Sequence, residues 1–409
     1  MDPQREFCPN LDGPARGQVG LGTIGVHSQQ ERRYKCTVCG RTFAASRGTP
    51  FYRVHSPQGL LLVVLSLLSW GCPVQAVVHT FALDERTVAA WLQRTGQHCQ
   101  QVHQHLVQQG QVDLQHVQAD ELWVKLVGQR AWLAMALAVP SRLWLGGVIS
   151  PQRDTELITA LVRHVRACAT ALGILVCVDG LATYVTAFLR VFRHPVRTGR
   201  PGRPRLEVEP DLLIGQVVKR SAQRRVVSTS QRVVRGTAAA IGAVLDATAT
   251  GTGIHTAYIE RLNATFRSHL TPLVRRGRAS AHTVATLDAG MWLVGTSYNV
   301  CWSHASLRLE APAGSGRKWL ERTPAMAAGL TDHPWTLRDL LHYGCPCLPG
   351  WLPSGVAARP STSTSLQCRW QPDPGSVWSY RSTAWPSFRI ADSSQPDRSA
   401  DGTAPISCS

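Results

Sequence analysis

The spacing of the apolar residues changes along the chain. Residues 56–98 show a helical period, whereas residues 117–149 show the shorter period of β-strands. The helical period returns at residues 154–172 and 254–275. A chain of 409 residues has room for two or three domains, and this order of segments predicts a mixed α/β protein.

Three short helices are expected within residues 56–98. Ser56 caps the first helix and Pro57 begins it. The second helix is predicted at residues 74–81, and Asp84 caps the third. Short helices joined by tight turns are typical of a helix-turn-helix DNA-binding segment, although a plain helical linker between domains fits the pattern equally well.

The next segments predict the core. A linker rich in Gln and His is expected at residues 97–118. Three strands with tight turns between them should form an antiparallel meander over residues 117–127, 131–139 and 143–149. A helix at residues 154–172 and a short apolar strand at residues 174–178 follow. Three strands, a helix and a buried fourth strand are the opening order of the RNase H-like fold.

The charge is strongly basic and uneven. The chain has 43 Lys and Arg residues against 26 Asp and Glu residues, a formal net charge of +17. Between residues 190 and 235 there are twelve basic and three acidic residues, which gives +9. Such a block predicts contact with the phosphates of nucleic acid. Arginine-rich codon usage is the alternative explanation for the overall excess.

The basic block predicts a cationic insertion at residues 195–236 that interrupts the core. Within it, Gly-Arg-Pro occurs twice, and Arg200, Arg203 and Arg205 are the candidate DNA-binding residues. A flat cationic segment can lie in a narrow minor groove. We favour the alternative of a solvated loop that touches only phosphates.

The sequence predicts neither a secretory signal nor a membrane-spanning segment. The first residues are polar and mixed in charge, unlike a secretory signal. The dense apolar run at residues 60–70 is too short to span a bilayer. We therefore expect a cytoplasmic, nucleoid-associated protein without a membrane partner.

Residues 345–409 are rich in Pro and Ser and are expected to be a disordered tail.

Three acidic residues stand out because acids are scarce. Asp120 lies in the first predicted strand, Asp179 ends the buried strand, and Glu260 lies on the helix after the basic block. Two Asp and one Glu from distant elements form an oxygen-only cage that suits Mg²⁺ or Mn²⁺. Two such ions can activate an attacking oxygen and stabilise the leaving oxygen of a phosphodiester.

Each acid also has an ordinary structural interpretation. Asp179 stands before a glycine and could be a turn residue. Glu260 could be a solvated helix position, and Asp120 competes with its neighbour Glu121.

Three segments change this balance. They are Asp120 to Trp123 followed by residues 132–137, Val178 to Gly180 followed by Tyr184, and Ala257 to Arg267 with the pattern Ile-Glu-Arg-x-Asn. They resemble the three acid motifs of bacterial insertion-sequence DDE transposases, most of all the insertion-sequence-one type. The third motif is the most specific, and the likeness covers residues 8 to about 340, which is most of the chain.

The resemblance implies an integrase-like RNase H core over residues 115–310 with two Mg²⁺ or Mn²⁺ ions. Asp120 and Asp179 would hold the metals and Glu260 would complete the second metal site. Arg261 and Arg267 would hold phosphates. The implied reaction is cleavage of double-stranded DNA at the element's ends and strand transfer to target DNA, performed by a homo-oligomer on DNA.

The family also implies a zinc-ribbon-like module at residues 1–50. Cys36 and Cys39 are a zinc-knuckle half-site, and Cys8 is a third thiol. Gly13 stands where the family pattern has a second cysteine, so the ligand set is incomplete unless His27 or water completes it. This departure favours the first of two alternatives, a DNA-binding remnant that no longer catalyses. The second alternative is a metal-dependent nuclease without strand transfer.

Overall fold

The structure is a computed structural model. It describes residues 1–10, 12–109, 112–197, 203–222, 225–274, 283–312 and 314–345. The chain divides into two units, residues 1–354 and 355–409, and the second unit lies outside the described residues. The tail expected at residues 345–409 therefore also lies outside them, except for Cys345.

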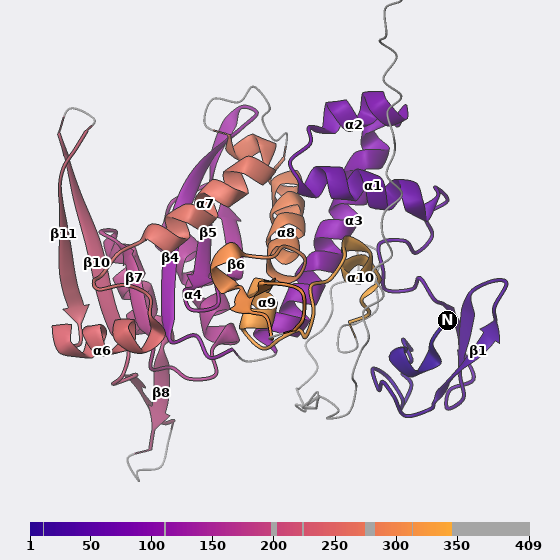
Figure 1. The fold of residues 1–409 in the computed structure, drawn as a ribbon, viewed down its shortest axis with the longest axis horizontal. Helices are drawn as coiled ribbons and strands as arrows, with labels where there is room; N and C mark the ends of the chain where they lie inside the picture. The colour runs from indigo at the N-terminus through magenta and orange to yellow at the C-terminus, as the bar shows by residue number, and fades with distance from the viewer. Residues whose placement is uncertain are drawn as a thin grey trace, which may run out of the picture. The chain divides into compact units, whose positions relative to one another are not determined.

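A six-stranded mixed sheet forms the centre of the first unit, in the order β11-β10-β7-β4-β5-β6 (Figure 1). Its strands are β4 (His116–Leu126), β5 (Gln129–Ala138), β6 (Leu143–Ser150), β7 (Leu175–Asp179), β10 (Leu213–Ala222) and β11 (Arg225–Arg235). Strands β4, β5 and β6 are antiparallel, so the predicted meander is confirmed. Strand β7 runs parallel to β4, and β10 runs parallel to β7.

Helices cover both faces of this sheet. Helices α4 (Thr155–Cys168) and α5 (Ala182–Val191) pack against each other, and α4 contacts β5 and β6. Helices α6 (Ala238–Thr248) and α7 (Ala257–His269) contact β4. Successive side chains of β4 point to opposite faces. Since Glu121 bonds to Tyr184 of α5 and Asp120 bonds to Asn263 of α7, the two helix groups lie on opposite faces.

Three helices precede the sheet: α1 (Gln58–Ser69), α2 (Val74–Phe81) and α3 (Glu85–His103). The predicted bounds of α2 are confirmed, and the Asp84 side chain caps α3 by accepting from the Arg86 backbone N–H at 2.7 Å. The predicted cap of α1 is wrong, because Pro57 occupies the cap position without a side-chain hydrogen bond.

The linker expected at residues 97–118 is also wrong. Helix α3 continues to His103, and a π-helical turn, η2 (Gln104–Gln108), extends it. Cys99 and Val102 are buried, and α3 packs along α8 (Val284–Val300). Because these apolar side chains are buried on one face, the segment remains helical although it is rich in Gln and His.

The basic segment is only partly an insertion. Strands β8 (Arg193–Val196) and β9 (Arg205–Val208) form a separate hairpin, but β10 is a strand of the central sheet. The apolar side chains of Leu212 and Ile214 are buried, which explains why this part joins the core instead of interrupting it.

The N-terminal residues form a small antiparallel sheet of β1 (Ile24–Ser28), β2 (Arg33–Cys36) and β3 (Thr42–Ala44). Its buried cluster comprises Cys8, Ala15, Ile24, Tyr34, Cys36 and Phe43. So small a cluster stabilises a module weakly unless a metal or a cross-link assists it.

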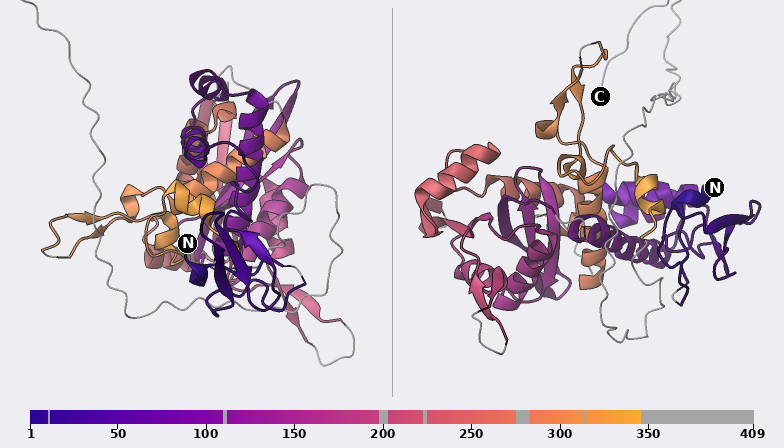
Figure 2. Two further views of the ribbon diagram at one scale, coloured as in Figure 1. Left: turned by 90° about the vertical axis from the view of Figure 1, so that its right-hand side faces the viewer. Right: turned by 90° about the horizontal axis from the view of Figure 1, so that it is seen from below.

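The C-terminal part of the first unit contains short elements: β12 (Leu309–Glu310), β13 (Trp319–Leu320), α9 (Pro324–Ala327) and α10 (Leu337–His342). The β12–β13 hairpin, in orange, projects away from the neighbouring helices in both views of Figure 2. Within the described residues, no helix combines the length and the apolar character that crossing a bilayer requires.

Candidate functional site

Carboxylates gather where β4 and β7 lie side by side. Ala119 of β4 pairs with Val178 of β7, so the next positions on the two strands carry Asp120 and Asp179. Oxygen atoms of Asp120, Glu121 and Asp179 all lie within 4.8 Å of one another. The structure thus brings together two of the predicted acids and adds a third from the neighbouring position.

Glu121 was expected only as a competitor of Asp120. Its side chain is 2% exposed and accepts hydrogen bonds from Tyr184 Oη at 2.9 Å and from the guanidinium of Arg153. Burial and the charge of Asp179 raise its pKa, although Tyr184 and Arg153 favour the ionised form. Its two oxygens accept from a tyrosine hydroxyl and from a guanidinium, so Glu121 holds Arg153 beside Asp179.

The surroundings of Asp120 disfavour its ionised form. Burial and then the charge of Glu121 raise its pKa to about 7, and the charges of Asp179 and Glu260 add to the effect. One oxygen accepts from the Glu121 backbone N–H at 2.9 Å and the other from Asn263 Nδ2 at 2.7 Å. Because nearby like charges disfavour ionisation, a cation here would lower the free energy of the ionised form.

Glu260 lies in the first turn of α7, near the cluster but outside the group of three close carboxylates. Its Oε1 accepts from Lys219 Nζ at 2.7 Å and from Thr256 Oγ1 at 3.1 Å. Partial burial opposes ionisation, but the hydrogen bond and charge of Lys219 outweigh it and hold the Glu260 pKa below its usual value. The negative charge of Glu260 nevertheless contributes to the raised pKa of Asp120.

A buried glutamine attaches α7 to the strand that carries Asp120. Gln118 Oε1 accepts from the backbone N–H groups of Tyr258 and Ile259, both at 3.0 Å. The first N–H groups of a helix have no partner within the helix, so this side chain acts as a cap. Asn263, one turn beyond Glu260, makes the second attachment through Asp120. The sequence alone did not indicate the role of either residue.

Two basic side chains flank the acids. Arg153 bonds to Glu121 and lies 3.8 Å from Asp179 Oδ2. Lys219 of β10 bonds to Glu260, and this hydrogen bond is the main reason why the Lys219 pKa is raised. The charges of Asp120 and Asp179 raise it further. Both cations partly balance the negative charge of the acids.

The predicted DNA-binding arginines are distributed over two regions. Arg261 is exposed on α7, and Arg267 lies two turns beyond Glu260 on the same side of that helix. Arg203 and Arg205 are exposed at the β8–β9 hairpin, where Arg205 lies 3.7 Å from Glu207. Arg200 lies outside the described residues.

The acid site fits a hard divalent cation. Its donors are carboxylate oxygens, the ligands that Mg²⁺ and Mn²⁺ prefer. The amide oxygen of Asn263, beside Asp120, is buried without a hydrogen-bond partner and is a further oxygen for a cation or its water. Asp120 and Asp179 would hold the ion, and Glu260 is the acid available for a second position.

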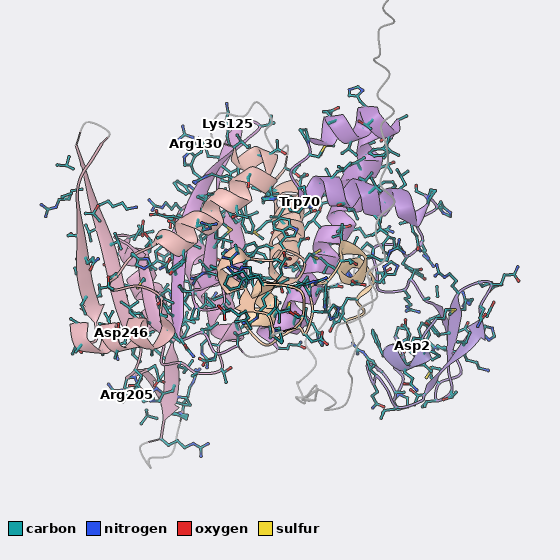
Figure 3. All side chains as sticks on the ribbon, in the orientation of Figure 1. Asp2, Trp70, Lys125, Arg130, Arg205 and Asp246 are labelled. Atoms are coloured by element: carbon teal, nitrogen blue, oxygen red, sulfur yellow. The ribbon has the colours of Figure 1, made fainter. Side chains whose placement is uncertain are left out.

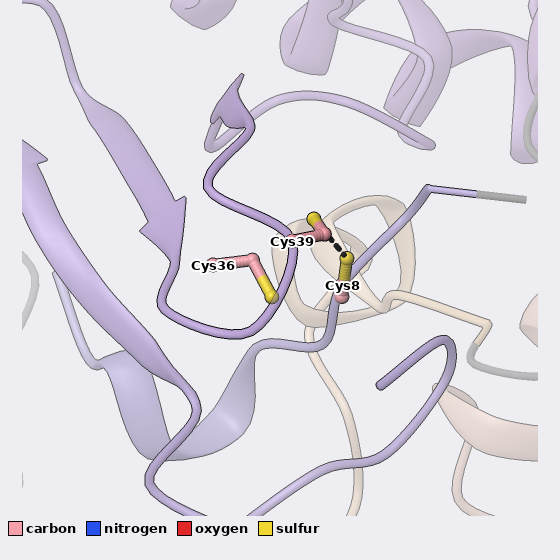
Figure 4. A group of neighbouring side chains, drawn as sticks. All are labelled: Cys8, Cys36 and Cys39. Atoms are coloured by element: carbon pink, nitrogen blue, oxygen red, sulfur yellow. Dashed lines mark hydrogen bonds between the residues drawn. The ribbon is translucent and has the colours of Figure 1, made fainter. Parts of the chain in front are cut away.

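A second candidate metal centre lies in the N-terminal module. The sulfur atoms of Cys8, Cys36 and Cys39 lie within 4.8 Å of one another, and Figure 4 shows their side chains converging. Cys8 Sγ and Cys39 Sγ are 3.5 Å apart. Gly40, with φ +70°, closes the turn by donating its N–H to the Cys36 carbonyl at 2.9 Å. Three converging thiols could form a zinc site.

The fourth zinc ligand is not provided by His27. His27 is exposed on β1 and does not belong to the thiol group that the described residues form. Gly13 lies next to Asn10, whose amide a Cβ at position 13 would approach to 3.2 Å. Asn10 also hydrogen-bonds to the Cys39 thiol. A longer side chain at position 13 would therefore enter the neighbourhood of the thiols.

No model of a protein family matches the chain, and no curated protein sequence matches it. The function must therefore be inferred from the site itself.

Proposed function

We propose that the chain is a metal-dependent DNA strand-transfer enzyme of the insertion-sequence transposase type, with an RNase H-like core. The strand order β6-β5-β4-β7-β10 supports the proposed core, because an antiparallel meander continues into strands parallel to β4. The proposal also retains a helix-turn-helix role for α1 to α3 and a homo-oligomer on double-stranded DNA.

The observation that carries the proposal is the pair of carboxylates on adjacent parallel strands with a third acid on an attached helix. Asp120 and Asp179 belong to one close group, and Glu260 acts electrostatically on Asp120. Isolated acid clusters are common, but here Gln118 and Asn263 tie the helix of Glu260 to β4. Such attachment is expected where acids must keep a fixed separation.

Each residue of the site has its own role in the proposed reaction. Asp120 and Asp179 hold the metal, Glu260 completes the second position, and Glu121 keeps Arg153 in place. Divalent ions bound there would activate the attacking oxygen and stabilise the leaving oxygen of the phosphodiester. Lys219 and Arg153 would orient the phosphate by charge, and Arg261 and Arg267 would hold DNA along α7.

The test is cleavage of a plasmid that carries the gene with its flanking DNA, with Mg²⁺ or Mn²⁺. Asp120→Asn, Asp179→Asn and Glu260→Gln should each reduce cleavage at least about 1000-fold while DNA binding stays within about threefold, because metal ligands and not phosphate contacts are removed. Cleavage that survives any of these changes means that the acids are wrongly assigned.

Glu121→Gln is the matched variant. It keeps acceptor and shape but removes the charge that holds Arg153, so cleavage should fall about 10- to 100-fold and recover partly at higher Mg²⁺. Loss as complete as for Glu260→Gln would make Glu121 the third ligand. Cleavage by the wild type without joining to target DNA would favour a metal-dependent nuclease without strand transfer. DNA binding by the wild type without cleavage would favour a DNA-binding remnant that no longer catalyses.

A further inference from the structure

The β4–β5 hairpin extends from the acid cluster with an unusual outer face. Side chains two residues apart share a face of a strand, so Glu121, Trp123 and Lys125 lie in one row. Across the hairpin, Trp123 pairs with Trp132 and Lys125 pairs with Arg130. Trp123 is 55% exposed, and Lys125 and Arg130 are exposed at the hairpin end, where Figure 3 labels them.

This face is continuous with the acids. The Arg153 guanidinium lies 5.1 Å from the centre of the Trp132 ring and also bonds to Glu121. From Glu121 the row reaches Trp123 after about 7 Å and Lys125 after about 13 Å, at roughly 3.3 Å per residue. Two aromatic side chains and two cations thus follow one another outward from the carboxylates.

Folding alone does not account for this arrangement. Like charges directly opposite each other on neighbouring strands are destabilising, and Lys125 faces Arg130 in this way. A largely exposed Trp123 also contributes little to the core. A ligand with flat apolar rings and closely spaced negative charges would stabilise both pairs.

We propose that this face binds unpaired nucleotides of a DNA strand. One base stacks on the Trp123–Trp132 pair, and the adjoining phosphates contact Lys125 and Arg130. Unpaired bases are favoured over a duplex because the faces of paired bases are already covered by their neighbours. If the proposed function is correct, the bound nucleotide lies next to the bond that is cleaved, and this part of the inference rests on the proposed function. The binding of an unpaired strand does not rest on it.

The first test measures binding of a short single-stranded thymidine oligonucleotide with one 2-aminopurine, without divalent ions so that no cleavage occurs. Trp123→Leu should weaken binding roughly 5- to 150-fold, the range for one base on one aromatic side chain, and should reduce the quenching of 2-aminopurine. Trp123→Phe should retain most of both. Trp319→Leu is the control and should leave both unchanged, because Trp319 is a partly exposed tryptophan on β13, in the hairpin that projects away from the neighbouring helices (Figure 2).

The second test concerns the phosphates. Lys125→Ala with Arg130→Ala should lower the slope of log affinity against log salt by about 1.4, since each phosphate of a single strand that a cation neutralises adds about 0.7 to it. Arg317→Ala with Lys318→Ala removes the same charge from the exposed β12–β13 turn and should leave the slope unchanged.

The outcomes separate this inference from the proposed function. Weakened oligonucleotide binding by Trp123→Leu supports the inference even if no variant or wild type cleaves DNA. Wild-type binding by that variant overturns it even if cleavage is normal. An equal loss of fully paired duplex binding on Trp123→Leu also overturns it, because the face would then not select unpaired bases. So does a change of oligomeric state on Trp123→Leu without any effect on the oligonucleotide, because a second copy would then cover the face.

Discussion

Asp120 is ionised with difficulty because of its surroundings. It lies among Glu121, Asp179 and Glu260, and burial together with their charges raises its pKa to about 7. A group whose pKa is raised in the folded state stabilises the fold while it is protonated. This contribution is fully present below the unfolded pKa, near 4, and is lost as the pH rises through about 7.

We therefore expect Asp120→Asn to stabilise the metal-free protein at high pH. Its Tm should match that of the wild type near pH 4 and exceed it at pH 8 by on the order of 5 °C. Thermal unfolding with a chelator across this pH range measures the difference. Asp246→Asn, on the exposed side of α6, is the control and should show no such trend. A Tm difference that does not vary with pH would contradict the expectation.

At the level of single residues, Asp179 was predictable because the end of a buried strand can be recognised from its apolar run, and Asp120 because acids are scarce in this chain. Glu121 was not, because neighbours in a strand point to opposite faces. Asp179 is the last residue of β7, however, and at the end of a strand its side chain can approach acids from both faces of the sheet. It therefore lies close to Asp120 and to Glu121. Lys219 and Gln118 also escaped prediction, since their partners lie far away in the sequence.

Among the elements, α3 and α8 approach each other unusually closely. A Cβ at Gly96 would lie 2.4 Å from the Cα of Ala289 and 2.8 Å from its carbonyl oxygen. Neither atom can move without its helix. The absence of a side chain at position 96 therefore sets the distance between the N-terminal helices and the core.

Gly96→Ala should destabilise the protein by about 1–3 kcal/mol, because the extra methyl group forces the two helices apart. Gly242→Ala is the matched control: Gly242 lies within α6, and a Cβ there would meet no atom within 4 Å. This change should stabilise by up to about 1 kcal/mol through helix propensity. Urea unfolding of both variants gives the comparison, and equal midpoints would refute the close packing.

The N-terminal module should bind zinc, but more weakly than a four-cysteine ribbon. Gly13→Cys should tighten zinc binding at least about tenfold, since a complete site supplies on the order of 10 kcal/mol. Burial raises the pKa of Cys8 to about 12, so affinity should increase with pH as the thiols lose protons. Zinc stoichiometry and competition with a chelator test both proteins. If the wild type already holds zinc as tightly as the variant, the missing-ligand explanation fails.

Element prediction succeeded where local signals dominate. Pro73 and the apolar spacing defined α2, and tight turns defined the meander. It failed for residues 97–108, where Gln and His suggested a linker although Cys99 and Val102 keep the helical spacing and are buried. It also failed for β10, whose pairing with β7 depends on a contact between distant segments.

In the molecule as a whole, three histidines are buried in different contacts. His98 bonds to the Leu340 carbonyl at 2.9 Å, His103 to the Leu145 carbonyl at 3.2 Å, and His116 to Thr250 Oγ1 at 2.9 Å. Burial lowers the pKa to about 4 for His98 and to about 3 for the other two. The folded protein therefore holds them neutral where the unfolded chain would protonate them.

Stability should consequently fall as the pH drops from about 6.5 towards 4, because depressed histidine pKa values contribute only above the unfolded pKa. The raised pKa values of Asp120 and Glu121 act in the opposite direction, so the histidine contribution is taken from the difference between each variant and the wild type. His116→Gln should make the fall less steep, whereas His333→Gln, at an exposed position, should not. Unfolding midpoints between pH 4 and 7 would show it, and identical slopes for all three proteins would contradict the assignment.

The cap that Gln118 places on α7 also has a consequence for biosynthesis. The two residues that it joins, Gln118 and Tyr258, are 140 positions apart. At roughly 5–20 residues per second, β4 leaves the ribosome about 7–30 s before its helix follows. During that interval Gln118 lacks its backbone partners and Asp120 lacks Asn263. A chain released before α7 would carry two of the three proposed acids and would be inert, so translation itself sets the earliest moment of activity.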